Sequence, residues 1–224
     1  MDVYLEIGKK KVFACALDWP GWARSGKDEA SALQALLDYG ERYAKVVSQV
    51  EGFRLPGDVS ELRVVERLEG NATTDFGAPG KPPTADAQPV SESELERLEK
   101  VLDASWQAFL QAVREAGGKE LRSGPRGGGR QLEKIKLHVL DAGIGYTRQV
   151  GWKFAEAQDP GDARLDAALE LTRQASLDAL RASARGELPK KGPRGGERWS
   201  PRYFARRSAW HLLDHAWEIE DRVV

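Results

Sequence analysis

A proline-rich stretch at residues 71–90 constrains the fold of this 224-residue chain more than any other feature. It contains Pro79, Pro82, Pro83 and Pro89, separated mostly by small residues. Proline lacks a backbone N–H and clashes inside a helix, so neither a packed helix nor a central strand runs through such a stretch. The sequence therefore predicts a linker or an extended surface loop here, with a folded domain on each side.

Residues 1–70 are expected to form a small α+β domain. Short runs rich in Val, Tyr, Phe and Leu flank Gly8 and three lysines, a pattern typical of a β-hairpin. Apolar residues then recur at helical spacing, and Ser25, followed three residues later by Asp28, is a candidate cap for that helix. The expected order is ββαβ, with strands at 2–7, 11–18 and 61–68 and a helix at 26–48.

From residue 91 onward every strong signal is helical. Ser91 and Glu94 have capping-box spacing, and Ser200 followed by Pro201 is a clear helix start. Four helices of this length indicate a four-helix bundle. We therefore predict an α+β chain in which a ββαβ domain precedes an all-α bundle, with helices at 91–117, about 130–154, about 162–184 and from 201.

Composition excludes several classes of protein. Thirty-four basic residues face 35 acidic ones, so a dedicated nucleic-acid binder, with its usual basic excess, is not expected. No apolar run approaches the ~20 residues that span a bilayer, and the N-terminus has no apolar signal core. Cys15 is the only cysteine, which excludes an internal disulfide framework and a thiolate-rich zinc site. We expect a cytoplasmic protein without a membrane partner.

The three histidines of the chain carry the strongest chemical signal. His211 and His215 are four residues apart on the last predicted helix, which places both imidazoles on one face. His138 lies on the apolar face of the second helix of the predicted bundle. Three buried imidazoles with no ligand would each lose solvation, whereas a shared metal ion would offset that cost. The alternative is three unrelated histidines, each satisfied by one hydrogen bond.

Leu212 follows the first histidine of the pair, where a zinc protease of the HExxH type needs its glutamate. That class is therefore excluded. Three neutral imidazoles would leave a divalent metal its full charge, so a water or thiol in a fourth position would become a nucleophile near neutral pH.

Several charged residues near the histidines in sequence are candidates for supporting roles. Asp141, Asp214 and Glu218 are the carboxylates that could orient the imidazoles, although a surface position suits Glu218 better than Asp214. Arg207, one turn before His211, is a candidate for holding an anionic substrate group, or else pairs with a surface acid.

Two basic loops share the sequence GPRGG, at 124–128 and 192–196. The first loop, 117–130, contains four basic residues and one acidic residue. The second loop, 185–198, contains five basic residues and two acidic ones. If the second and fourth helices of the bundle run parallel, both loops lie at the same end, and Arg126 and Arg194 would attract an anionic substrate there. The alternative is two flexible, solvated connections.

The segment RRSAWHLLDHAWEIED (206–221) resembles the last helix of the DinB/YfiT-like superfamily of metal-binding four-helix bundles. Trp210, His211 and His215 match its Trp-His-x-x-x-His pattern, and His138 in KLHVLDAGIGYTRQVG (136–151) matches its third histidine. The resemblance covers about residues 91–224. It implies a divalent metal, zinc, nickel or iron, held by three histidines with an open position. In this superfamily some members transfer or isomerise substrates with low-molecular-weight thiols.

A looser resemblance concerns the N-terminal domain. The stretch ALDWPGWARSGKDEASALQAL (16–36) is similar to HicB-like antitoxin domains, which carry a Pro-Gly turn before their helix. Such domains neutralise toxins or accompany DNA-binding partners, but no helix-turn-helix or basic tail follows here.

Two functions from different classes follow from these patterns. The first is a metal-dependent enzyme, a transferase or hydrolase, acting on a small molecule. The second is a non-catalytic regulatory or protein-binding module in which the metal only stabilises the bundle; structural metal sites are closed, so a fourth protein ligand would favour it. A second apolar stripe, Trp210, Leu213 and Trp217, is expected to pack internally or to form a homodimer contact.

Overall fold

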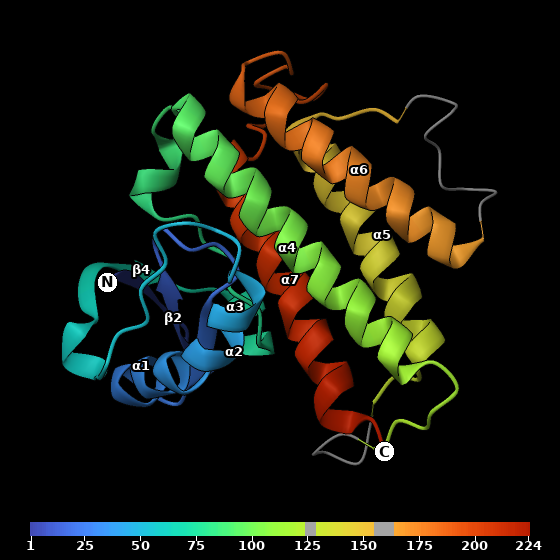
Figure 1. The fold of residues 1–224 in the computed structure, drawn as a ribbon. Coiled ribbons are helices and arrows are strands. Elements are labelled where there is room, and N and C mark those ends of the chain that lie inside the picture. The colour runs from blue at the N-terminus through green and yellow to red at the C-terminus, as the bar shows by residue number, and fades with distance from the viewer. Residues whose placement is uncertain (124–128, 155–163) are drawn as a thin grey trace. The chain divides into compact units, whose positions relative to one another are not determined.

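The computed structural model describes residues 1–123, 129–154 and 164–224. They form two compact units, Met1–Pro89 and Val90–Val224 (Figure 1). The first contains a four-stranded sheet and the second a bundle of long helices, so the chain has mixed α and β structure with the bundle after the sheet. Among the described residues no helix is both long enough and apolar enough to cross a membrane.

A mixed sheet with strand order β3-β2-β1-β4 forms the N-terminal unit. β1 pairs antiparallel with β2 and parallel with β4, and β2 pairs antiparallel with β3. The elements are β1 (Asp2–Ile7), β2 (Val12–Ala16), β3 (Ala23–Gly26), α1 (Glu29–Asp38), α2 (Gly40–Val46), the short 3-10 helix η1 (Val59–Glu61) and β4 (Arg63–Glu69).

The three predicted strands are present, but the predicted ββαβ order is incomplete. It lacks β3, a four-residue strand whose ARSG sequence carries no apolar alternation, so only its pairing with β2 defines it. The single predicted helix is two helices that join at Tyr39. Ser25 lies in β3, and the cap is Asp28, which accepts a hydrogen bond from the backbone N of Ser31.

The prediction of a linker over 71–90 is wrong for most of that stretch. Residues up to Pro89 belong to the N-terminal unit and include α3 (Ala72–Phe76) and the 3-10 helix η2 (Thr84–Ala87). Glu6, fully buried in β1, holds the stretch: its carboxylate accepts hydrogen bonds from Thr74 Oγ1 and from the backbone N of Gly80 and Lys81. The prolines exclude long helices and strands from this stretch, but the buried carboxylate of Glu6 holds its irregular backbone in place.

The C-terminal unit contains α4 (Glu92–Ala116), α5 (Leu132–Val150), α6 (Leu165–Ala184) and α7 (Pro201–Arg222). Ser91 and Ser200 are confirmed as N-caps, because they accept hydrogen bonds from Glu94 N and Tyr203 N; the Glu94 side chain pairs with Arg202 and does not complete the predicted capping box. The α5 helix ends at Gly151, whose φ of 95° is in the left-handed region that favours glycine. These boundaries agree with the expected helices to within a few residues.

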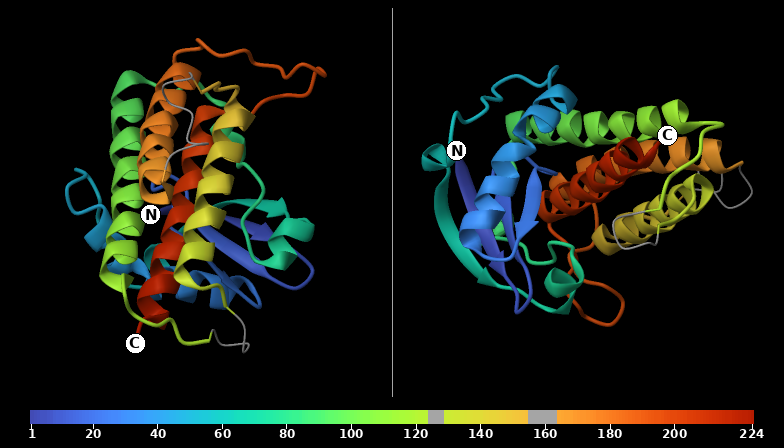
Figure 2. Two further views of the ribbon diagram at one scale, coloured as in Figure 1. Left: turned by 90° about the vertical axis from the view of Figure 1, so that its right-hand side faces the viewer. Right: turned by 90° about the horizontal axis from the view of Figure 1, so that it is seen from below.

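The four helices form two parallel pairs that run in opposite directions (Figure 2). In the first pair α4 and α7 are parallel, since Arg202 on α7 pairs with Glu94 near the start of α4, and Val223 bridges Leu121 beyond their ends. In the second pair α5 and α6 are parallel, since Lys136 pairs with Asp166 near both starts. The two pairs are antiparallel: Trp199, just before α7, donates a backbone hydrogen bond to the carbonyl of Gln149 at the end of α5.

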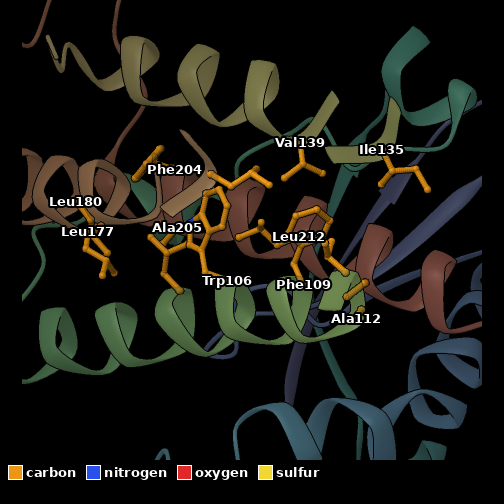
Figure 3. Packing of buried hydrophobic residues seen from close by; sticks show 14 of the residues in the cluster. Trp106, Phe109, Ala112, Ile135, Val139, Leu177, Leu180, Phe204, Ala205 and Leu212 are labelled. Carbon is orange, nitrogen blue, oxygen red and sulfur yellow. The ribbon is translucent and has the colours of Figure 1, made fainter. Parts of the chain in front are cut away.

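Large side chains from all four helices fill the centre of the bundle (Figure 3). Trp106 and Phe109 of α4 and Phe204 of α7 are each at most 1% exposed. Gly143 permits a close approach of two helices, since a Cβ there would lie 2.8 Å from Thr172 Cγ2 of α6. The α5 helix, which carries His138, is therefore packed closely against α6, and α7 contributes Phe204 to the same core.

Candidate metal centre

The three histidines of the chain converge between α5 and α7. His211 Nε2 and His138 Nε2 are 3.2 Å apart, and one ring nitrogen from each histidine lies within 4.8 Å of the others. The imidazole rings meet edge to face, with centroid separations of 4.7–5.0 Å. His211 and His215 are each 7% exposed, whereas His138 is half-buried. Three histidines near one another could hold a metal ion.

Burial keeps two of these imidazoles neutral. It lowers the pKa of His211 well below the ordinary value of 6.5, and the positive charge of Arg207 adds to the effect. Burial also lowers the pKa of His138, with Arg130 contributing in the same direction, while Asp141 and Glu218 oppose it. A neutral imidazole is the form that ligates a metal. The site is therefore prepared for a cation even though its surroundings are positively charged.

A carboxylate fixes the orientation of one histidine. Glu218 Oε2 lies 2.8 Å from His215 Nδ1, three residues earlier on α7. When that bond uses the Nδ1 proton, Nε2 of His215 remains free as the ligand atom. Burial alone would raise the pKa of Glu218, but the bond to His215 and the charge of Arg222 outweigh it and lower the pKa. Glu218 is therefore an ionised partner that orients the ring.

Arg222 extends this network to the preceding loop. Its guanidinium donates to Glu218 Oε1 at 2.5 Å and to the backbone carbonyls of Arg122 and Arg130 at 3.0 and 2.8 Å. Arg222 is 5% exposed, so these bonds satisfy a buried cation. The series of hydrogen bonds from His215 through Glu218 to Arg222 therefore connects the histidines to Arg122 and Arg130, on the two described sides of the 117–130 loop.

The expected ranking of the supporting carboxylates was wrong. Glu218 is the carboxylate that bonds a histidine ring, although a surface position had been expected for it. Asp141 is exposed, and its charge acts to raise the pKa of His138. Asp141, Asp214 and Glu218 each lie three residues after a histidine, so their spacing alone does not distinguish them.

The prediction that both GPRGG loops border the site is also wrong, since its condition, parallel α5 and α7, is not met. The 117–130 loop lies beside the end of α7, and the 185–198 loop lies beside its start. Arg194 is exposed in the latter, where residues 191 and 197 bridge in a hairpin-like turn. His211 is about 15 Å along α7 from Pro201 at 1.5 Å per residue, so Arg194 does not adjoin the histidines. Arg126 lies outside the described residues.

Arg207 is beside the histidines, as the sequence indicated. Its guanidinium carbon is 4.7 Å from the ring centroid of Trp210 and 5.5 Å from that of Tyr146. Tyr146 on α5 packs edge to face on His211, with centroids 5.6 Å apart, and stands 5.3 Å from Trp199. Aromatic rings and one cation therefore border the histidines on the side toward the start of α7.

Sequence reasoning missed Arg222, Tyr146 and Arg130. The spacings His215–Glu218 and Glu218–Arg222 are those of side chains that meet on one helix face, so that relay was detectable. Tyr146 was not detectable in the same way, because its place beside His211 depends on the antiparallel packing of α5 against α7.

Comparisons with protein-family models, curated proteins and solved structures found no match to this chain. The resemblances to the DinB-like and HicB-like families therefore stay predictions, and the site is interpreted from its own geometry.

Proposed function

We propose that the bundle binds one divalent metal ion through His138, His211 and His215, and that it is a metal-dependent enzyme of the DinB-like type acting on a small molecule. The observation that carries this proposal is the convergence of three ring nitrogens within 4.8 Å from two helices. These are the only three histidines of the chain, and His138 lies 73 residues before His211.

The spacing of the nitrogens fits a metal. Zinc–nitrogen bonds of ~2.0–2.1 Å in a tetrahedral site place ligand atoms about 3.3 Å apart. The His138–His211 pair, at 3.2 Å, already has that spacing, and a ring nitrogen of His215 lies within 4.8 Å of both. Both ring nitrogens of the close pair are Nε2, so in a metal-free chain one must donate to the other; a shared metal ion removes that competition.

Two features favour a catalytic site over a structural one. Among the described His, Cys, Asp and Glu residues, the cluster contains the three histidines and no fourth ligand, whereas structural zinc sites hold four. His138 is half-buried, so the cluster is not sealed from solvent. A bound divalent ion would supply a Lewis acid able to activate a water molecule or a thiol.

The residues of the chain have defined tasks in this proposal. Glu218 keeps the proton of His215 on Nδ1 and holds the ring in place, and Arg222 keeps Glu218 ionised. Tyr146 packs on His211 and limits the rotation of that ring. The resemblance to the DinB-like superfamily suggests the substrate class, a small molecule processed with a low-molecular-weight thiol.

Metal analysis tests the first part of the proposal. Purified chain should contain close to one equivalent of zinc, nickel or iron, or take it up after treatment with a chelator. His138→Ala, His211→Ala and His215→Ala should each lose most of that metal, while a substitution at exposed Glu220 should not. A folded wild-type chain that takes up none of the three metals would overturn the proposal.

A screen for thiol-dependent transfer and isomerisation tests the enzymatic part. The metal-loaded chain should turn over a substrate that the metal-free chain does not. Loss of turnover in His211→Ala should accompany its loss of metal. A loaded chain that is strongly stabilised yet inert in the screen would point instead to the non-catalytic, metal-stabilised module.

A further inference from the structure

Arg207 is the charged residue beside the histidines whose role the metal site does not explain. It lies four residues before His211 on α7, so the two side chains share one face of the helix. Its Nη1 is buried and has no hydrogen-bond acceptor in the described part of the chain. Its observed contacts are the faces of the Tyr146 and Trp210 rings.

Three other arginines of the bundle have carboxylate partners, in contrast to Nη1 of Arg207. Arg202 and Arg173 pair with Glu94 and Asp103, and Arg222 pairs with Glu218. A guanidinium nitrogen that is removed from water without an acceptor costs free energy, so native proteins seldom leave one in that state. The aromatic contacts of Arg207 hold the cation in place but satisfy no N–H group.

The charges around Arg207 favour the binding of a negatively charged ligand group. The Arg207 guanidinium packs on the Tyr146 ring, which in turn packs edge to face on His211, so this cation borders the histidines. The acid bonded to the cluster, Glu218, is already paired with His215 and Arg222. A divalent ion would add two further positive charges. A negatively charged ligand group is the partner that this arrangement lacks.

We propose that Arg207 binds the carboxylate of a small organic acid whose other end ligates the metal held by the three histidines. This inference rests on the proposed metal site. The i, i+4 separation of Arg207 and His211, about 6 Å between Cβ atoms, limits the ligand to a few bonds between its metal-binding atom and its carboxylate. The rings of Tyr146 and Trp210, on which the guanidinium packs, favour a planar anionic group such as a carboxylate.

Cobalt-loaded protein allows the metal and the anion to be measured separately. Cobalt content and the visible absorption of the ion report whether the site forms. Titration with 3-mercaptopropionate, compared with the uncharged 3-mercaptopropan-1-ol, then reports what the carboxylate adds, because both probes ligate cobalt through sulfur. Wild-type protein should bind the carboxylate probe about 10-fold or more tightly than the alcohol.

Arg207→Met should remove that preference and leave cobalt content unchanged, because methionine keeps an unbranched apolar stem against the two rings. Arg207→Lys should retain part of the preference, since it keeps the charge without the planar fork. Arg194→Met is the matched control: it removes one exposed positive charge from the loop before α7 and should keep the full preference.

The outcomes separate the two proposals. Wild-type chain that takes up no cobalt contradicts the metal site, and the anion site fails with it. Cobalt uptake with equal affinity for the two probes contradicts only the role of Arg207, as does an Arg207→Met variant that retains the preference. If Arg207→Met does not fold, the wild-type comparison and Arg207→Lys still decide the question.

Discussion

The relay from His215 through Glu218 to Arg222 leads to a prediction about metal affinity. Glu218→Ala removes the acceptor 2.8 Å from His215 Nδ1 while leaving all three histidines in place. The ring then loses its fixed tautomer and orientation, and Nε2 is no longer held toward the other two nitrogens. We expect zinc affinity to fall about 10–100-fold, the usual cost of removing a group that orients a metal ligand.

The magnitude agrees with the strength of the bond that is lost. A hydrogen bond to a charged group contributes about 1.5–3 kcal/mol. A 10–100-fold change in affinity corresponds to about 1.4–2.7 kcal/mol. Glu218→Gln should cost less than Glu218→Ala, since its amide oxygen still accepts a hydrogen bond from Nδ1 but carries no charge.

The assay is competition between the chain and a chromophoric zinc chelator at 25 °C. Circular dichroism must first show that each variant is folded, because Arg222 is 5% exposed and loses its carboxylate partner. Glu220→Gln, at an exposed position on the same helix, is the matched control and should bind zinc like wild type. Unchanged zinc affinity in folded Glu218→Ala would refute the argument that this carboxylate tunes the site.

Three further predictions concern stability. Gly143→Ala should destabilise the bundle by about 1–3 kcal/mol in urea titrations, because the new Cβ would meet Thr172 Cγ2 at 2.8 Å. Gly145→Ala, with nothing within 4 Å, should instead stabilise α5 by up to about 1 kcal/mol, and equal effects at both positions would contradict the packing. Glu6→Ala should release residues 71–81 to limited proteolysis, because Thr74, Gly80 and Lys81 lose their shared acceptor; an unchanged digestion pattern would count against that anchor. Removal of metal by a chelator should lower the melting temperature of the bundle, since a ligand at 1,000 times its Kd stabilises by about 4 kcal/mol, and identical melting curves would argue against binding.

Local patterns predicted the helices of the bundle well. Ser91 and Ser200 begin α4 and α7 because their side chains accept hydrogen bonds from the first turn, an interaction that depends on neighbours in sequence alone. The spacing of His211 and His215 likewise fixed their common face. These features need no knowledge of how the helices pack.

The features that sequence reasoning missed all depend on contacts between distant segments. β3 exists because β2 pairs with it, and the 71–81 segment is ordered because Glu6 accepts its N–H groups. The direction of α5 relative to α7 depends on packing across the bundle, which apolar periodicity does not encode. The hypothesis that both GPRGG loops border the histidines failed because it assumed that these two helices run parallel.

The antiparallel arrangement of α5 and α7 also explains why the sequence identified the three clustered histidines but placed the two basic loops wrongly. In a parallel pair, His138 and His211 would meet at similar depth below two basic loops. In the observed pair, His138 lies two turns from the start of α5 and meets the middle of α7, so only the 117–130 side adjoins the cluster, through Arg222. The opposite side is bordered by Arg207 and Tyr146, which approach each other only because the two helices run in opposite directions. In our proposal the positive charge offered to a ligand is the half-buried guanidinium of Arg207, packed on the Tyr146 and Trp210 rings, and its effect should depend less on salt than that of an exposed basic rim.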